Sequence, residues 1–464
     1  MEYITVAEAS KLCEKTPRYL QKLCKEGKIE GARQRDNGRW EIPAESVPHC
    51  AVRGAAPPER RRVLPAGMSD FARTVRDFFY IDKTSLLQTW MEEGAPVTLF
   101  AQPAGFGKTM NMDMLRRYLE LSEGSGEDLF AEKKIRRTDR EYRAYQGAYP
   151  VIFLSFKSVR FPAWGDCLDK LRMVIAQEYQ RHRELEQSGR LSRYEKRYFE
   201  AAAQGDLSVA ELSSAAFRLS MMLREQYERP VVIMIDAYDA PALQGYRCGF
   251  ETEALPFLGA FFSETFKDNP HMAYGFLAGE IPACGESGLE GLYHIRSFPV
   301  WEEPFAEFFG FTQEEVERIA MYCGHPDKLE QVREWYGGFL SGRTELYHPW
   351  SVINYFASGA EPGVYRQRAE ADVFLSRILG KASAQEAARL EALLQGGELE
   401  TELETDVVCR LLLEAGYVTQ TERREGKDGS RRCWIRIPNR EAEILYRREV
   451  LTKLKRTDTA VSQH

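Results

Sequence analysis

The sequence predicts an α/β fold, with a core built on a parallel β-sheet and a small module of helices and a β-hairpin on each side of that core. Two observations predict the core. Apolar runs of strand length, at residues 97–100 and 231–235, each lead into residues suited to a ligand crevice, and strands alternate with helices to about residue 300. A third observation predicts the first module. The 464-residue chain has a net charge of −7, but its amino-terminal part is rich in basic residues.

The first module is expected to begin with two short helices. Thr5 and Glu8 have the spacing of a capping box, and Thr16-Pro17 supplies an N-cap followed by a first-turn proline for the second helix. Gly27 is expected to end that helix. Residues 29–32 and 38–43 then predict two strands of a hairpin around a polar turn.

This order resembles the small winged helix-turn-helix domains of the excisionase-like and MerR-like group. The residues that meet the pattern of that group are Thr5, Glu8, Ala9, Leu12, Gly27, Ile29, Arg39, Trp40, Ile42 and Pro43. The resemblance implies that residues 1–50 bind duplex DNA, with the second helix in the major groove and the hairpin against phosphate or the minor groove. The contacts would come from Arg18, Gln21, Lys22, Lys25, Arg33, Arg35 and Arg39. The alternative is a winged helix that binds a protein partner and keeps a solvated basic face.

The rest of the chain divides by composition and pattern. Residues 51–66 are rich in Pro and Ala and predict a linker, and residues 67–312 predict the sheet core, with strands at 97–100, 150–156, 231–236 and 272–277. The charged segment 176–206 predicts a solvated helical insertion. A helical lid is expected at 313–400, a second small winged-helix-like domain at 401–455 with strands at 417–422 and 432–437, and a tail at 456–464.

The loop after the first core strand predicts a phosphate-binding site, or P-loop. Gly105 and Gly107 allow backbone N–H groups to converge on an anion, and Phe106 lies between them. Lys108 is expected to reach the β and γ phosphates, and Thr109 to hold a metal ion through its hydroxyl group. The alternative is an ordinary glycine turn, since Gln102 stands where the P-loop motif has its first glycine.

Asp236 ends the apolar strand 231–236, so its carboxylate is expected to face the crevice at the carboxyl end of the sheet. There it would hold Mg²⁺. The alternative is an aspartate that caps the next turn.

Over residues 65–437 the chain resembles the AAA-ATPase-like family that is often fused to a PD-(D/E)XK nuclease domain in bacteria. The family's blocks occur in order: Y-x-D-K-T at 80–84, the loop with F-G-K-[ST] at 106–109, I-D-E-Y-D-A-P at 235–241, W-Y-D-G-Y at 335–339 and N-P-W-S-V-x-N-Y at 348–355. The resemblance implies a P-loop ATPase core that binds ATP with Mg²⁺.

The departures from the family pattern affect its chemical groups. The loop arginines are replaced by Gln102, Ala104 and Gly105, Ala237 stands at the position of the glutamate, and Pro282 replaces a cation after the fourth strand. Residues that orient water or stabilise charge in phosphoryl transfer are worth several orders of magnitude in rate. We therefore expect hydrolysis near background, with Asp239 as the remaining candidate for the missing acid.

Composition excludes several classes of protein. No apolar stretch reaches the length of about 20 residues that a membrane span needs, and the amino terminus has no signal-peptide pattern, so a cytoplasmic protein without a membrane partner is expected. Too few residues follow position 437 for a nuclease domain, so nuclease activity is not expected.

The sequence thus favours a DNA-binding protein whose ATPase-like module binds nucleotide or serves as a scaffold, and which acts as a homo-oligomer. A slow ATPase that remodels DNA or a partner is the rival hypothesis, and a relic without either activity is a third.

Overall fold

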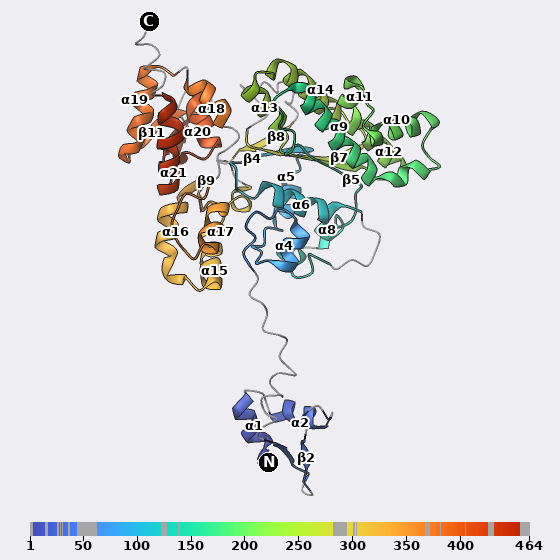
Figure 1. Cartoon of the computed structure of the whole chain (residues 1–464), viewed down its shortest axis with the longest axis vertical. Coiled ribbons are helices and arrows are strands. Elements are labelled where there is room, and N and C mark those ends of the chain that lie inside the picture. The colour runs from blue at the N-terminus through green and yellow to red at the C-terminus, as the bar shows by residue number, and fades with distance from the viewer. Residues whose placement is uncertain are drawn as a thin grey trace. The chain divides into compact units, whose positions relative to one another are not determined.

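The structure, a computed structural model, comprises two compact units, residues 1–63 and 64–464 (Figure 1). It describes residues 3–13, 17–25, 27, 29, 31–35, 38–43, 63–121, 128–137, 140–281, 295–299, 302, 304–366, 372–380, 382–403, 405–425 and 431–454.

The amino-terminal unit contains the predicted helices and hairpin together with one further strand. Its elements are β1 (Tyr3–Thr5), α1 (Val6–Cys13), α2 (Pro17–Lys25), β2 (Arg33–Gln34) and β3 (Trp40–Pro43). The strands form an antiparallel sheet in the order β1-β3-β2. The backbone N–H of Thr5 donates to Glu8 Oε2 (2.8 Å) and the backbone N–H of Glu8 donates to Thr5 Oγ1 (3.3 Å), so the predicted capping box is present. Leu20, Cys24 and Ile42 belong to its small apolar core.

The prediction of a strand at residues 29–32 was wrong. The backbone N–H of Ala32 donates to the carbonyl of Ile29, and Gly31 has a φ of +77°, so this segment turns and the strand begins at Arg33. A side chain at position 31 would meet Pro43 Cγ at 2.9 Å, which explains the need for glycine at that turn.

The second unit contains a parallel five-stranded sheet, as the sequence predicts. Its order is β5-β6-β7-β4-β8, with every described pair parallel. The strands are β4 (Val97–Ala101), β5 (Val151–Ser155), β6 (Val231–Asp236), β7 (Met272–Gly279) and β8 (Arg296–Pro299). Four of them match the predicted strands, and β8 was not predicted.

Helices cover both faces of this sheet (Figure 1). One face packs against a group that consists of α9 (Trp164–Arg181), α10 (Arg193–Gln204), α11 (Val209–Ser213), α12 (Ala215–Tyr227), α13 (Ala240–Cys248) and α14 (Glu251–Phe266). Against the other face lie α4 (Phe71–Asp77), α5 (Leu86–Glu93), α6 (Lys108–Leu119), α7 (Lys134–Arg137) and α8 (Arg140–Arg143). The arrangement is a three-layer α/β core.

Segment 176–206 is helical but is not a solvated insertion. It spans the end of α9, a 3₁₀ turn at Arg183–Gln187 and α10. Tyr179, Leu185 and Phe199 are each at most 1% exposed and belong to the core on that face of the sheet. The many charged residues in this segment suggested a solvated helix, and the apolar residues spaced between them, which pack on the sheet, were overlooked.

Two smaller clusters follow the sheet core. The first includes α15 (Gln313–Cys323), α16 (Leu329–Tyr336) and α17 (Pro349–Ala357), with the hairpin of β9 (Phe339–Ser341) and β10 (Thr344–Leu346) beside them.

The second cluster contains α18 (Asp372–Leu379), α19 (Ala384–Ala392), β11 (Leu399–Glu402), α20 (Val407–Glu414), β12 (Thr419–Glu425), β13 (Arg431–Arg436), α21 (Arg440–Leu445) and a π-helical turn at Tyr446–Leu451. Its sheet has the order β11-β13-β12, so β11 and the two helices before it join the part that was predicted to begin at residue 401.

Candidate functional site

The predicted phosphate loop lies between β4 and α6. Gly105 and Gly107 have φ angles of +79° and +83°, a conformation that glycine adopts without strain, and Gly107 directly precedes the first residue of α6. The loop therefore ends at a helix N-terminus, where backbone N–H groups are available to an anion. Strand β4 lies inside the sheet between β7 and β8, which fixes the start of the loop.

Lys108 begins α6 and folds back over the loop. Its ammonium donates to the carbonyls of Gln102 (2.7 Å) and Pro103 (2.9 Å). Burial lowers the pKa of Lys108, whereas the carboxylates of Glu280, Asp239 and Asp236 act in the opposite direction. The ammonium is therefore held against the loop by two neutral carbonyl acceptors, which a negatively charged phosphate can replace.

Asp236 and Thr109, which the sequence placed at one metal site, are brought together. The hydroxyl of Thr109 donates to Asp236 Oδ2 (3.2 Å), and Ser155 Oγ donates to the same oxygen (3.4 Å). The Asp236 side chain is 2% exposed. A hydroxyl and a carboxylate at the end of a parallel strand are the kind of oxygen ligands that Mg²⁺ takes beside a nucleotide.

Lys157 was missed by sequence analysis and meets both of these groups. Its ammonium donates to Thr109 Oγ1 and lies 3.5 Å from Asp236 Oδ2. A side-chain cation thus stands against the oxygens that would ligate Mg²⁺, and this arrangement does not fit a resident metal ion. Among the described residues, no group of three or more His, Cys, Asp or Glu side chains is placed to hold a metal.

Asp239, the candidate for the missing acid, supports the backbone. Its Oδ2 accepts from the N–H groups of Glu280 (2.6 Å) and Ile281 (3.0 Å), just after β7. Burial and the nearby Glu280 carboxylate raise the pKa of Asp239 to about 7. The side chain lines the cavity described below, but its hydrogen bonds favour a structural role over activation of water.

Ala237 stands where the family has glutamate, and its backbone is left-handed, with a φ of 52°. Such a conformation costs a residue with a side chain roughly 1–2 kcal/mol. A methyl group at this position provides no acid or base. Pro282, the other departure that the sequence marked, lies outside the described residues.

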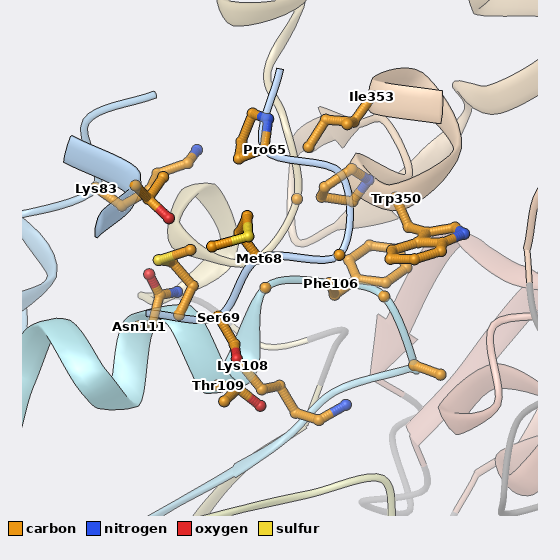
Figure 2. Close-up of a pocket in the computed structure, with 18 of the residues that line it drawn as sticks. Pro65, Met68, Ser69, Lys83, Phe106, Lys108, Thr109, Asn111, Trp350 and Ile353 are labelled. Carbon is orange, nitrogen blue, oxygen red and sulfur yellow. The ribbon is translucent and has the colours of Figure 1, made fainter. Parts of the chain in front are cut away.

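A cavity of about 390 Å³ runs from this polar end into an apolar half. Pro65 and Met68 line it from the segment before α4, and Trp350 and Ile353 line it from α17 (Figure 2). Phe311 lines it as well. Pro65 lies within the predicted linker, but here it forms part of the cavity wall. An apolar slot next to a phosphate loop suits a nucleobase.

The loop is anchored to the later part of the chain. His348 Nε2 contacts the carbonyl of Ala104 at 3.0 Å, and His348 Nδ1 accepts from the N–H of Ser351 at 3.2 Å, so the ring is a neutral Nε2–H tautomer. Burial lowers the pKa of His348 to about 3. Phe106, predicted to bind nucleotide, is fully buried and packs edge-on against Phe339 and His348, so only its backbone is available to a phosphate.

The Y-x-D-K-T block has a structural role. Lys83 forms a buried ion pair with Glu315 of α15 at 2.6 Å, and Asp82 accepts from the N–H groups of Thr84 and Lys134. These contacts join the start of the core to α15 and α7. The block therefore shapes the cavity that Lys83 also lines.

The predicted DNA contacts lie in the other unit. Gln21, Lys22 and Lys25 are exposed on α2, and Arg39 is exposed before β3. Arg33 and Arg35 both pair with Glu41, at 3.2 and 2.6 Å, and the Arg33 guanidinium lies over the Tyr3 ring. The side chain of Arg18 is outside the described part of the chain. Whether these residues bind DNA stays a prediction.

No helix in the described residues is long and apolar enough to cross a membrane.

Comparison with curated proteins gives no match to this chain. A family model described as a predicted AAA-ATPase matches residues 65–287, which include the phosphate loop, Lys157 and Asp236. This match confirms the resemblance for residues 65–287, and the resemblance of residues 288–437 stays a prediction. Residues 65–287 are thus similar to the predicted AAA-ATPase family, and that similarity indicates a nucleotide-binding, ATPase-like module.

Proposed function

We propose that the chain binds ATP in the cavity beside the phosphate loop, hydrolyses it near background and uses its amino-terminal unit to bind duplex DNA. One observation supports nucleotide binding above the others. Lys108, Thr109 and Asp236 all line one end of a cavity whose other end is apolar. The triphosphate would replace the loop carbonyls around the Lys108 ammonium, and the base would lie between the segment of Pro65 and the side chain of Trp350.

Two groups near the phosphate end support a binding role over efficient turnover. Ala237 carries no acid, and both hydrogen bonds that Asp239 Oδ2 accepts come from backbone N–H groups after β7. An enzyme that hydrolyses ATP needs a group that orients water and groups that stabilise developing charge. ATP would then act as a ligand that stabilises this unit, and a homo-oligomer would bring several DNA-binding units together.

The experiment is calorimetric titration of ATP into the full chain and into Lys108→Ala, with Lys267→Ala as the matched control. Lys267 is exposed and does not line the cavity. We expect the Lys108 variant to bind at least about tenfold more weakly, because it loses a charge-assisted contact to phosphate. Equal ATP affinity in the wild type and the Lys108 variant, or no binding to the wild type, would overturn the nucleotide proposal.

A slow ATPase is the second candidate, because Asp239 lines the cavity and its pKa of about 7 suits a general base. Phosphate release by the same proteins, together with Asp239→Asn and Ala237→Glu, decides between the two. Turnover that Lys108→Ala and Asp239→Asn both abolish would favour the ATPase, whereas release at the background rate supports a binding module. Ala237→Glu should raise turnover only if the remaining groups of the site are in place.

A further inference from the structure

The position of Lys157 is set by the sheet. It follows β5 by two residues, and β5 pairs with β6 in the register that places Ser155 opposite Asp236. The N–H of Phe156 donates to the carbonyl of Asp236 at 2.9 Å, which extends the pairing beyond the strand. Phe156 is 1% exposed, whereas Ser155 and Lys157, on either side of it, both reach Asp236. Lys157 lies in the turn after β5, which is closed by the N–H of Val159 donating to the carbonyl of Phe156 at 2.9 Å. This turn at the carboxyl end of the sheet places Lys157 at the phosphate end of the cavity.

The contacts of Lys157 are those of a counter-ion. The Asp236 side chain is 2% exposed and the Lys157 side chain is 47% exposed, so the lysine reaches in from the rim to a buried carboxylate. A buried carboxylate is stable only when a cation or hydrogen bonds compensate its charge. The Lys157 ammonium supplies that charge, and it also donates to Thr109.

A lysine in this position competes with a metal ion. Mg²⁺ requires oxygen ligands at about 2.0–2.1 Å in a near-octahedral shell. An ammonium in contact with both the Thr109 hydroxyl and the Asp236 carboxylate takes up the coordination sites of the two protein ligands. Mg²⁺ would have to displace a cation that the strand register already places there.

We propose that Lys157 takes the role of the metal ion, so that this site binds a nucleoside triphosphate without a divalent cation. The inference rests on the proposed nucleotide binding and extends it. Lys108 and Lys157 then contact the polyphosphate from two sides, one from the helix N-terminus and one from the end of β5. Arg160 also lines the cavity and adds a third positive side chain to its wall.

The test is calorimetric titration of ATP in two buffers, one with excess Mg²⁺ and one with EDTA. The proteins are the full chain, Lys157→Gln, Lys108→Ala and the control Lys267→Gln. For the wild type and the control we expect the two affinities to agree within about threefold. Lys157→Gln should lose at least about tenfold in EDTA, and Mg²⁺ should restore binding because the place between Thr109 and Asp236 is then open to a metal.

Each outcome separates this inference from the proposed function. Wild-type binding that needs Mg²⁺, or a Lys157→Gln variant that binds as well as the wild type in EDTA, overturns the role of Lys157 and leaves nucleotide binding intact. Wild-type binding in neither buffer overturns the proposed function itself. Melting temperatures of the ligand-free proteins show whether the Lys157 variant is folded, and Lys108→Ala shows that the measured binding occurs in this cavity.

Discussion

The role of a single side chain in this protein depends on contacts with residues that are remote in sequence. Lys157 illustrates a residue that the sequence could have revealed, because it directly follows the predicted strand 150–156 and so lies at the carboxyl end of the parallel sheet, where ligands bind. Asp239 illustrates the opposite case. Its role depends on the N–H groups of Glu280 and Ile281, which the fold brings to it from another strand. Local pattern identified the acid but not the groups that it would meet.

Glu414 carries a residue-scale prediction about pH. Its side chain is 2% exposed, neither carboxylate oxygen accepts a hydrogen bond within the described residues, and Arg410 Nε is 3.9 Å away. Burial raises the pKa of Glu414 to about 8 from an ordinary value of 4.5. The folded state therefore holds a proton that the unfolded state releases, and the free energy of unfolding falls as pH rises from 4.5 toward 8.

We expect Glu414→Gln to raise the free energy of unfolding by about 1–3 kcal/mol at pH 8.5 and by much less near pH 5, because the amide need not ionise or lose a proton. Urea unfolding at the two pH values measures this, with Glu330→Gln as a control at an exposed position. A gain of equal size at both pH values would contradict the pKa of Glu414 as the cause.

At the scale of elements, the sequence predicted the long apolar strands and the two capped helices of the amino-terminal unit. It did not predict short strands that pair with a strand from another predicted segment. Strands β4 to β7 have runs of five or more residues, whereas β8 and β11 have four each and depend on neighbours for their pairing. The expected boundary at residue 400 separated β11 from β13, with which it pairs. Composition alone could not show that Leu375 and Leu390 share a core with Ile435.

The hairpin of the amino-terminal unit carries a prediction about DNA. Hydrogen bonds from Arg35 and Arg33 hold the pKa of Glu41 below its ordinary value, so both arginines share one carboxylate. If the hairpin meets phosphate, Glu41→Gln should raise affinity for duplex DNA, because the two guanidinium groups no longer pair with an anion. Lys25→Ala on α2 should weaken binding and lower the salt slope by about one.

Fluorescence anisotropy with labelled duplex DNA over a range of salt concentrations measures both effects. Glu345→Gln, which removes the partner of Arg333 in the other unit, is the control. Unchanged DNA affinity in both Glu41→Gln and Lys25→Ala would argue for the alternative, a winged helix that binds a protein partner.

On the scale of the whole molecule, the cavity is lined by residues of the second unit. The described residues before position 63 do not line it, whereas Leu64, Pro65, Gly67, Met68 and Ser69 do. The sequence predicted a linker through residue 66 because Pro and Ala are frequent there. The cavity shows that the second unit begins earlier, at the point where Leu64 is buried beside Ile81 and Phe311.

Two truncations test this boundary. A chain that begins at residue 63 should bind ATP as the full chain does, and a chain that begins at residue 70 should bind about tenfold more weakly, because it lacks the wall that carries Pro65 and Met68. Calorimetry gives the affinities, and circular dichroism confirms that both proteins are folded. Equal affinities would mean that residues 64–69 do not contact the nucleotide.

The anchoring of the phosphate loop also has a thermodynamic consequence. His348 holds the carbonyl of Ala104, and Gly416, just after α20, lies so close that a side chain there would meet Pro103 at 3.2 Å. A ligand that moves Pro103 toward Gly416 would therefore displace the carboxyl-terminal cluster that contains α20, and the reverse effect must be equal. Any partner that binds this carboxyl-terminal part and shifts Gly416 would change the affinity for nucleotide by the same factor by which nucleotide changes the affinity for that partner.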